Sequence, residues 1–289
     1  MAFSRIDLKR RTIESLASES AAAGVAVSVE EVAPLSPVPL EELWDITYRL
    51  RRDIVTMIGK AGSGHPGGSL SAADILAVLY FGGILRHDPK HPRWPDRDRF
   101  ILSKGHAAPA LYATLAEAGY FPVEELLTLR QLDSRLQGHT DMTLTPGVEM
   151  SSGSLGQGLS FAVGTALAAR LDEKDSRVYV LIGDGESDEG QIWEAAMAAA
   201  HYKLDNLTAI LDRNEQQIDG WTSEVMSLEP VVDKWRAFGW NVIDVNGHSL
   251  PDLQSALEQA RLVSDRPTIL IAHTVKGKGV SLNLAGPEC

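Results

Sequence analysis

The pattern of apolar and polar positions along the chain predicts buried strands that alternate with helices. Continuous apolar runs at Val178–Ile182, Leu207–Leu211 and Pro267–Ala272 each end at glycine or polar residues. Apolar runs of roughly four to eight residues between turn signals are typical of strands buried on both faces of a parallel sheet. We therefore expect an α/β fold with a mainly parallel central sheet and helices on both faces.

The same pattern predicts the other elements of the fold. Two more strands are expected at Phe100–Leu102 and Trp240–Val245. The expected helices are Leu40–Ile58, Ser69–Tyr80, Ala107–Glu117, Glu124–Leu136, Leu159–Leu171, Glu186–Tyr202, Val231–Phe238 and Pro251–Ser264. Ser69 is expected to cap the second of these helices. The Ala-rich helix 159–171 contains Gly164, which suggests close packing against another helix.

Polar residues follow the first two apolar runs. Gly183-Asp184-Gly185 comes directly after one run, and Asn214 follows the next. The carboxyl ends of parallel strands lie at one edge of a sheet, where ligands bind. A carboxylate together with an amide or backbone oxygen suits Mg²⁺ when phosphate oxygens fill its other positions. An isolated Gly-Asp-Gly is more often a tight turn, but the second strand end with Asn214 favours a metal–diphosphate site.

The composition argues against several classes of function. The chain has 289 residues, a formal net charge of −12 and one cysteine, Cys289. No basic stripe stands out, which argues against nucleic acid as a partner, and no apolar run reaches membrane-spanning length. One cysteine allows no intrachain disulfide. Because the N-terminus also lacks the apolar stretch of a secretory signal, we expect a soluble, cytoplasmic protein.

The first residues differ in composition from the rest. Arg5–Arg11 is basic, Ser18–Ala26 is rich in small residues, and Glu30–Pro39 carries three prolines. We expect residues 1–39 to be a variable N-terminal extension, either a disordered arm or a contact segment for a partner. Residues 40–289 are then expected to form the main domain.

Three histidines lie in glycine-rich or helix-start segments. His65 lies in Gly62-Ser63-Gly64-His65-Pro66-Gly67-Gly68, His106 in Ser103-Lys104-Gly105-His106, and His139 in Gln137-Gly138-His139-Thr140. The glycines let the backbone lie against a ligand. The helix start at His106 also favours phosphate or a developing oxyanion. Taken singly, a histidine in such a turn is usually structural.

Taken together, these segments resemble the transketolase family of thiamine diphosphate enzymes. The resemblance rests on Gly-Asp-Gly at 183–185 with Asn214, on Ser-Gly-His-Pro-Gly at 63–67 and on Ser-Lys-Gly-His at 103–106. It implies a thiamine-diphosphate-binding fold, with thiamine diphosphate and Mg²⁺ (or Ca²⁺ or Mn²⁺) as cofactors. The implied metal ligands are the side chains of Asp184 and Asn214 and the backbone carbonyl of Gln216.

The resemblance also implies which residues contact cofactor and substrate. His65, His106 and His139 are the implied catalytic residues, which handle hydroxyl and oxyanion protons because histidine titrates near neutral pH. Glu189 is implied in a network that links the two active sites of a dimer. The implied cofactor-binding residues are Gly153, Leu155, Gly183, Asp184, Gly185, Glu189 and Asn214.

The chain departs from the family pattern in three places. Arg213 precedes the metal-binding Asn214 where the family often has Asp or Asn, and the family's Pro-Gly-His-Pro is Gln137-Gly138-His139-Thr140 here. The family's further histidine, after the strand-end loop 273–280, has no counterpart in the residues that follow. The first departure lies beside a metal ligand, whereas the other two bear on the substrate and leave the acceptor open.

The resemblance covers roughly residues 40–280, the cofactor-diphosphate half of a transketolase. The family's other half holds the aminopyrimidine ring and the glutamate that activates the cofactor. We therefore expect the N-terminal subunit of a split transketolase, which transfers a two-carbon ketol unit from a ketose (phosphate) donor to an aldose acceptor. The implied assembly is an α2β2 heterotetramer with a C-terminal subunit that carries the pyrimidine-binding domain.

Other hypotheses remain at this point. The chain could belong to a specialised two-component enzyme that delivers the two-carbon unit to a non-sugar or carrier-protein acceptor. It could be part of a 2-oxo acid dehydrogenase-like or deoxyxylulose-phosphate-synthase-like system. A non-catalytic subunit that keeps the fold is the hypothesis from a different class, although intact metal ligands argue against it.

Overall fold

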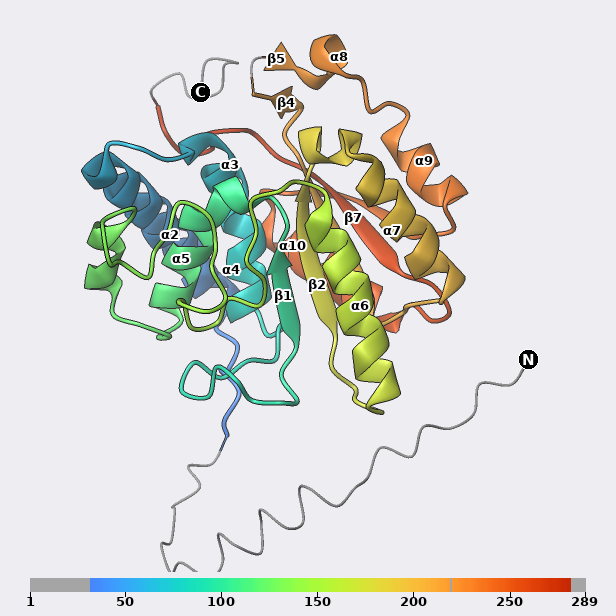
Figure 1. The fold of residues 1–289 in the computed structure, drawn as a ribbon, viewed down its shortest axis with the longest axis horizontal. Coiled ribbons are helices and arrows are strands. Elements are labelled where there is room, and N and C mark those ends of the chain that lie inside the picture. Colours follow the sequence, from blue (N-terminus) through green and yellow to red (C-terminus); the bar gives the residue numbers. More distant parts are fainter. Residues whose placement is uncertain (1–31, 219, 282–289) are drawn as a thin grey trace, which may run out of the picture. The chain divides into compact units, whose positions relative to one another are not determined.

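A parallel five-stranded sheet forms the centre of the protein (Figure 1). The computed structural model describes residues 32–218 and 220–281. The strand order is β1-β2-β3-β7-β6, and every neighbouring pair is parallel. The strands are β1 (Arg99–Leu102), β2 (Val178–Gly183), β3 (Leu207–Arg213), β6 (Asn241–Asn246) and β7 (Thr268–His273). The prediction of a mainly parallel α/β sheet is confirmed.

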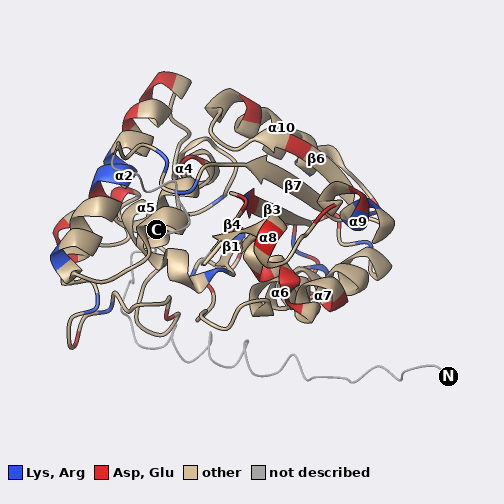
Figure 2. Ribbon diagram, turned by 90° about the horizontal axis from the view of Figure 1, so that it is seen from above, with Lys and Arg blue, Asp and Glu red and all other residues tan. Residues whose placement is uncertain are grey.

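Helices cover both faces of this sheet. The α-helices are α2 (Leu40–Ala61), α3 (Pro66–Ser71), α4 (Ala73–Phe81), α5 (Ala108–Glu117), α6 (Gln157–Leu171), α7 (Gly190–His201), α8 (Thr222–Val225), α9 (Val231–Ala237) and α10 (Leu250–Leu262). Short 3-10 helices are Gly105–Ala107, Val123–Thr128 and Gly185–Asp188, and a small antiparallel hairpin pairs β4 (Gln216–Gln217) with β5 (Gly220–Trp221). Figure 2 looks down on the carboxyl ends of the strands, with α4 and α10 on one side of the sheet and α6 and α7 on the other.

The three middle strands are apolar on both faces because alternate side chains enter two different cores. Leu181 and Ile210 pack into the cluster formed with α2, α4, α5 and α10. Val180 and Leu211 point the opposite way, into the cluster formed with α6, α7 and α9. This alternation is the two-residue period of a strand. It explains why β2, β3 and β7 read as continuous apolar runs in the sequence.

The strand register brings polar residues together at one edge of the sheet. Gly183 of β2 lies beside Asp212 of β3, and Arg213 lies beside His273 of β7. Because all strands run in parallel, the loops that follow β1, β2, β3 and β7 leave from this same edge. The sheet therefore gathers segments that are far apart in the sequence.

The predicted helix Glu124–Leu136 is wrong. A 3-10 helix covers Val123–Thr128 and turns follow it. Arg130 and Asp133 have φ values of 60° and 63°, a left-handed backbone that ends a regular helix. The Arg130 N–H instead donates to the Leu136 carbonyl (2.9 Å), which folds the segment back on itself.

Two predicted helix starts are also wrong. Ser69 lies inside α3, where its hydroxyl donates to the His65 carbonyl (2.8 Å) instead of capping the helix, and α4 begins only at Ala73. The segment after Asp184 first forms a 3-10 turn, and α7 begins at Gly190 because Glu189 is extended, with φ −68° and ψ 126°.

Part of the predicted N-terminal extension packs against the domain. The backbone N–H groups of Leu35 and Val38 donate to the carbonyls of His87 (2.8 Å) and Phe81 (2.9 Å). Residues 1–31 lie outside the described residues, so the division into 1–39 and 40–289 stays a prediction. Within the described residues, no helix is both long and apolar enough to cross a membrane.

Candidate active site

Asp184 and Asn214 meet at the carboxyl ends of β2 and β3. The Gly185 N–H donates to Asp184 Oδ1 (2.9 Å), and the Glu215 N–H donates to Asp184 Oδ2 (2.6 Å). The Asn214 Oδ1 accepts from the Gln216 N–H (3.1 Å). The carboxylate of one strand end is thus bonded directly to the loop of the next, which puts the predicted metal ligands in one place.

The Asp184 carboxyl is buried without a counter-ion. Its residue is 3% exposed, and no ion pair among the described residues includes it. Burial, and after it the neighbouring Asp212 carboxylate, raise its pKa to about 6. A buried carboxylate that is costly to ionise by itself is suited to a divalent cation.

The oxygen atoms at this site suit a metal ion that is also bound by phosphate. No cluster of three or more His, Cys, Asp or Glu side chains able to hold a metal occurs in the part of the chain that the structure describes. Asp184, Asn214 and the Gln216 carbonyl supply one carboxylate and two neutral oxygens. Mg²⁺ prefers six oxygen ligands and commonly takes substrate or cofactor phosphates. These residues therefore fit Mg²⁺ bound together with a diphosphate.

The structure reveals a buried ion pair beneath this site that the sequence analysis missed. The Lys104 ammonium contacts the Asp212 carboxylate and donates to the Gly68 carbonyl (3.0 Å). The side chains of Lys104 and Asp212 are 2% and 0% exposed. Ser71 donates to Asp212 Oδ2 (2.5 Å), and the Thr274 hydroxyl donates to Oδ1. Burial alone would raise the pKa of Asp212, but the Lys104 charge and these hydrogen bonds outweigh it and lower the pKa.

This pair ties together the loops around the site. Lys104 follows β1, Asp212 is the penultimate residue of β3, and Gly68 belongs to α3, three residues after His65. A Cβ placed on Gly183 would lie 3.6 Å from Lys104 Cδ, so the lysine stem also passes the Gly-Asp-Gly turn. Two sequence features could have indicated this ion pair. Asp212 is a carboxylate at the end of an apolar run, and Lys104 lies two residues before His106.

Glu186 is a second buried residue that links several loops through hydrogen bonds, and it was not predicted from the sequence. Its carboxylate accepts from the Gly183 N–H (2.9 Å), the Gly156 N–H (2.9 Å) and the Ser103 hydroxyl (2.5 Å). Burial raises the pKa of its carboxyl, although the three hydrogen bonds oppose this rise. Glu186 therefore holds together the loops after β1 and β2 and the glycine-rich turn before α6.

Replacing Glu186 with glutamine is expected to lower the free energy of unfolding by about 1–3 kcal/mol. The glutamine amide would turn N–H groups toward backbone N–H donors, so buried donors would lose their acceptor. Urea unfolding of the free chain measures this loss. Glu194→Gln, an exposed change on α7, is the matched control and should stay within about 0.5 kcal/mol. Equal effects of the two changes would contradict the role given to Glu186.

The three predicted histidines lie close to one another. The rings of His65 and His106 meet edge to face, with centroids 5.6 Å apart. A Cβ on Gly153 would lie 3.5 Å from His139 Cγ, and one on Gly105, next to His106, would lie 2.8 Å from the Gly153 N. Gly153 has φ 148°, which L side chains rarely adopt. Glycine at these positions thus permits the close approach of the histidine loops.

The expected near-neutral titration does not hold for His106. Burial, and after it the Lys104 charge, lower its pKa to about 3. Burial likewise lowers the pKa of His65, together with the charge of Arg130. In the free chain His106 is therefore neutral at physiological pH. One ring nitrogen can donate and the other can accept a hydrogen bond.

The remaining predicted residues lie around the glycine-rich turn. Gly153 is exposed and Leu155 half-buried in the segment before α6. Glu189 is exposed at the start of α7, and a Cβ on Gly156 would lie 2.8 Å from Glu189 Cβ. Glu189 thus lies next to the glycine-rich turn and at the protein surface.

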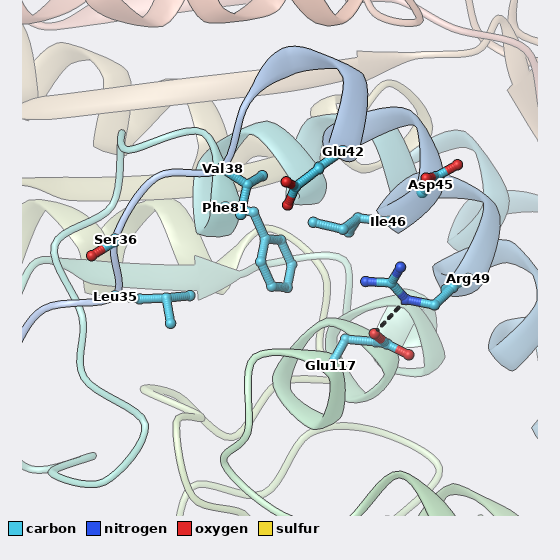
Figure 3. Close-up of a pocket in the computed structure, with 9 residues that line it drawn as sticks. All are labelled: Leu35, Ser36, Val38, Glu42, Asp45, Ile46, Arg49, Phe81 and Glu117. Atoms are coloured by element: carbon cyan, nitrogen blue, oxygen red, sulfur yellow. Dashed lines mark hydrogen bonds and ion pairs between the residues drawn. The ribbon is translucent and has the colours of Figure 1, made fainter.

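A cavity of about 260 Å³ lies away from all these residues (Figure 3). It is lined by Leu35, Ser36, Val38, Glu42, Asp45, Ile46, Arg49, Phe81 and Glu117. Arg49 Nε donates to Glu117 Oε2 (2.8 Å), which pairs two of the charged side chains that line it. None of the predicted site residues reaches it.

The family model described as "Transketolase, thiamine diphosphate binding domain" matches residues 45–287. The chain therefore belongs to the transketolase family and contains its thiamine diphosphate-binding domain, as the motifs indicated. Solved structures agree with this assignment. The chain superposes on transketolase from Campylobacter jejuni with a TM-score of 0.81 and 37% identity, over 87% of this chain and 40% of that protein.

Shorter relatives match the chain over most of their length. One is the 6-deoxy-6-sulfo-D-fructose transketolase subunit SqwG of Clostridium sp. (strain MSTE9), 52% identical over 81% of this chain and 85% of that protein. Another is an apulose-4-phosphate transketolase subunit of Phocaeicola vulgatus, 48% identical over 80% of this chain and 82% of that protein. The expectation of a split transketolase subunit, with thiamine diphosphate as cofactor and a partner subunit, is confirmed.

Proposed function

We propose that the chain is the cofactor-diphosphate subunit of a two-component transketolase whose ketose donor carries an anionic group. The observation that carries this proposal is the hydrogen bond from the Glu215 N–H to Asp184, which joins the strand ends that carry Asp184 and Asn214. The anionic donor is supported by the two subunit relatives, which are named for a sulfonated ketose and a ketose phosphate. A 2-oxo acid dehydrogenase-like subunit has no comparable support.

Asp184, Asn214 and the Gln216 carbonyl would hold Mg²⁺, and through it the diphosphate of the cofactor. Thiamine diphosphate supplies the electron sink for breaking and forming the bond beside a ketose carbonyl. Gly105 lets the loop after β1 pack against the glycine-rich turn, because a Cβ there would lie 2.8 Å from the Gly153 N. The chain's contribution is thus to fix the metal and to hold the cofactor's charged end.

The histidines would act on the substrate through hydrogen bonds. His65 and His139 are exposed, whereas His106 is half-buried beside Gly68. A neutral imidazole can accept a hydrogen bond from a substrate hydroxyl at one nitrogen while it donates from the other. We assign these roles to His65, His106 and His139 together, because their rings share one small region.

We also propose that the partner is a C-terminal subunit with the pyrimidine-binding domain, in an α2β2 heterotetramer. Phe161 on α6 is 40% exposed and Met197 on α7 is 55% exposed. Gly164, expected to pack closely against a helix, is exposed, and a Cβ there would meet nothing within 4 Å. Within the described residues, the expected close packing at Gly164 is therefore not found. Apolar side chains and open glycines on neighbouring helices suit a subunit interface.

The test is ketol transfer with this chain alone and with its companion subunit, each with thiamine diphosphate and Mg²⁺. The donors are 6-deoxy-6-sulfo-D-fructose, apulose 4-phosphate and xylulose 5-phosphate, and the acceptor is ribose 5-phosphate. Transfer by the mixture alone, from at least one donor, is the expected result. Donor cleavage without transfer would overturn the aldose acceptor in favour of a different one. Activity of the chain alone would overturn the split site, and no cleavage at all would overturn the proposed function.

Cofactor binding is expected to weaken as the pH falls below about 6. The pKa of Asp184 is raised to about 6 in the free chain, so protons compete with Mg²⁺ below this pH. The apparent affinity for thiamine diphosphate and Mg²⁺ should fall about tenfold per pH unit there and stay level above about pH 7. Calorimetric titration of the assembled enzyme at a series of pH values measures this. A flat profile through pH 5–7 would exclude Asp184 as a ligand.

The same carboxyl affects the free chain with the opposite sign. A folded-state pKa of about 6 exceeds the ordinary aspartate value of 3.8, so the folded chain holds the extra proton between these values. The stability from this group is therefore present below about pH 4 and is lost as the pH rises through 6.

A further inference from the structure

The loop after β7 lies against the first turn of α3, next to His65. The Gly277 N–H donates to the Gly67 carbonyl (3.1 Å). The stem of Lys276 lies against Gly67, because a Cβ on that glycine would be 2.8 Å from both Cγ and Cε of the lysine. Lys276 is also one of the charges that lower the pKa of His65, after burial, Arg130 and His139. The position of loop 274–279 therefore determines where Lys276 lies relative to His65.

A polar cluster of three side chains lies behind this loop. Asp74 of α4 is 2% exposed. Arg51 of α2 donates to both of its oxygens, at 3.0 and 2.6 Å, and His248 Nδ1 lies 2.7 Å from Oδ2. Burial by itself would raise the pKa of Asp74, but the hydrogen bonds from His248 and Arg51 outweigh it and lower the pKa. Asp74 is therefore an ionised acceptor.

The cluster contacts loop 274–279 at two points. The Val275 N–H donates to His248 Nε2 (2.8 Å), and Arg51 Nε donates to the Lys278 carbonyl (3.0 Å). A ring nitrogen that accepts from an N–H carries no proton. The His248 proton is therefore on Nδ1, where it donates to Asp74. Asp74 selects the tautomer, and the tautomer leaves Nε2 free to hold Val275.

We infer that His248, oriented by Asp74 and Arg51, is a positioning residue that anchors loop 274–279 and so places Lys276 beside His65. The anchoring lies within this chain and is independent of any substrate. Its effect on ketol transfer rests on the proposed function. His248 touches no predicted cofactor or metal ligand, and it acts through the loop.

The two contacts of His248 can be separated by substitution. The path from Cβ to Oε1 of glutamine has as many atoms as the path from Cβ to Nε2 of histidine. In His248→Gln the side chain can therefore still accept from Val275, but it no longer donates from the Nδ1 position to Asp74. Asparagine matches the path to Nδ1, so His248→Asn can still donate to Asp74 but does not reach Val275. If the role of His248 is to hold the loop, His248→Gln should resemble the wild type more closely than His248→Asn. If its role is only to donate to Asp74, His248→Asn should be the closer of the two.

The experiment compares the wild-type chain, His248→Gln and His248→Asn by hydrogen–deuterium exchange. The readout is the peptide that contains Val275 and Gly277, with peptides of β2 and β3 as internal controls. We expect His248→Asn to speed exchange at this peptide roughly five- to tenfold, the equivalent of one lost hydrogen bond, while His248→Gln stays within about twofold of wild type. Thermal unfolding should rank the variants the other way, because the buried Asp74 loses a donor only in His248→Gln.

Steady-state kinetics of the assembled enzyme completes the test. The kcat/KM for the ketose donor should follow the exchange ranking and not the stability ranking. Faster exchange in His248→Gln than in His248→Asn, or equal exchange in all three chains, would overturn the inference. If the wild-type assembly shows no transfer, the proposed function fails, and the exchange ranking alone still decides whether His248 anchors the loop.

Discussion

Asp184→Asn is expected to reduce ketol transfer by the assembled enzyme about 100-fold or more, through loss of metal and cofactor binding. Asp184 is the one carboxylate among the proposed metal ligands, and the other two ligands are neutral oxygens. Asparagine keeps the size of the side chain but removes the charge that opposes the cation. Titration calorimetry with thiamine diphosphate and Mg²⁺, together with the transfer assay, measures both losses.

The free Asp184→Asn chain is expected to stay folded. The wild-type carboxyl is buried near Asp212, another negative charge, so its removal relieves repulsion in the absence of metal. Asp233→Asn makes the same chemical change on α9, where the side chain is 70% exposed. This control should bind cofactor and transfer ketol units as the wild type does. Full cofactor affinity in Asp184→Asn would show that the metal site lies elsewhere.

Lys104→Met is expected to destabilise the chain by about 3–5 kcal/mol, because it leaves the Asp212 carboxylate buried without a counter-ion. Methionine keeps most of the lysine stem that passes Gly183. Ser71 and Thr274 would still donate to Asp212, but two hydroxyls do not balance a buried charge. For a chain of this size the melting temperature should fall by roughly 10 °C. Thermal and urea unfolding of the free chain measure the change.

Two further variants isolate the charge effect. Adding Asp212→Asn to Lys104→Met removes the orphaned charge, so the double variant should be more stable than Lys104→Met alone. Lys174→Met breaks an ion pair with Asp96 whose side chains are 30% and 58% exposed, and it should cost less than about 1 kcal/mol. A double variant no more stable than Lys104→Met would mean that the lysine contributes packing and not charge.

The sequence predicted the strands more accurately than the turns and loops. All five strands of the sheet were placed within one or two residues, because runs such as Val178–Ile182 have no other way to bury both faces. The helix predicted at Glu124–Leu136 failed because periodicity alone does not reveal left-handed residues such as Arg130. The β4–β5 hairpin and α8 carry too few residues to produce a periodic signal.

The sequence by itself determined the family, the cofactor and the predicted metal ligands. Binding of a metal and a diphosphate requires particular residue types at strand ends. Gly-Asp-Gly at 183–185 with Asn214 can therefore be recognised from the sequence alone. The tertiary structure decided which buried groups support them. Lys104 and Asp212 are 108 residues apart, and Asp74 and His248 are 174 apart. It also decided that His106 is neutral, since a pKa depends on burial and on nearby charges. Those quantities exist only once the parallel strands have brought their loops to one edge of the sheet.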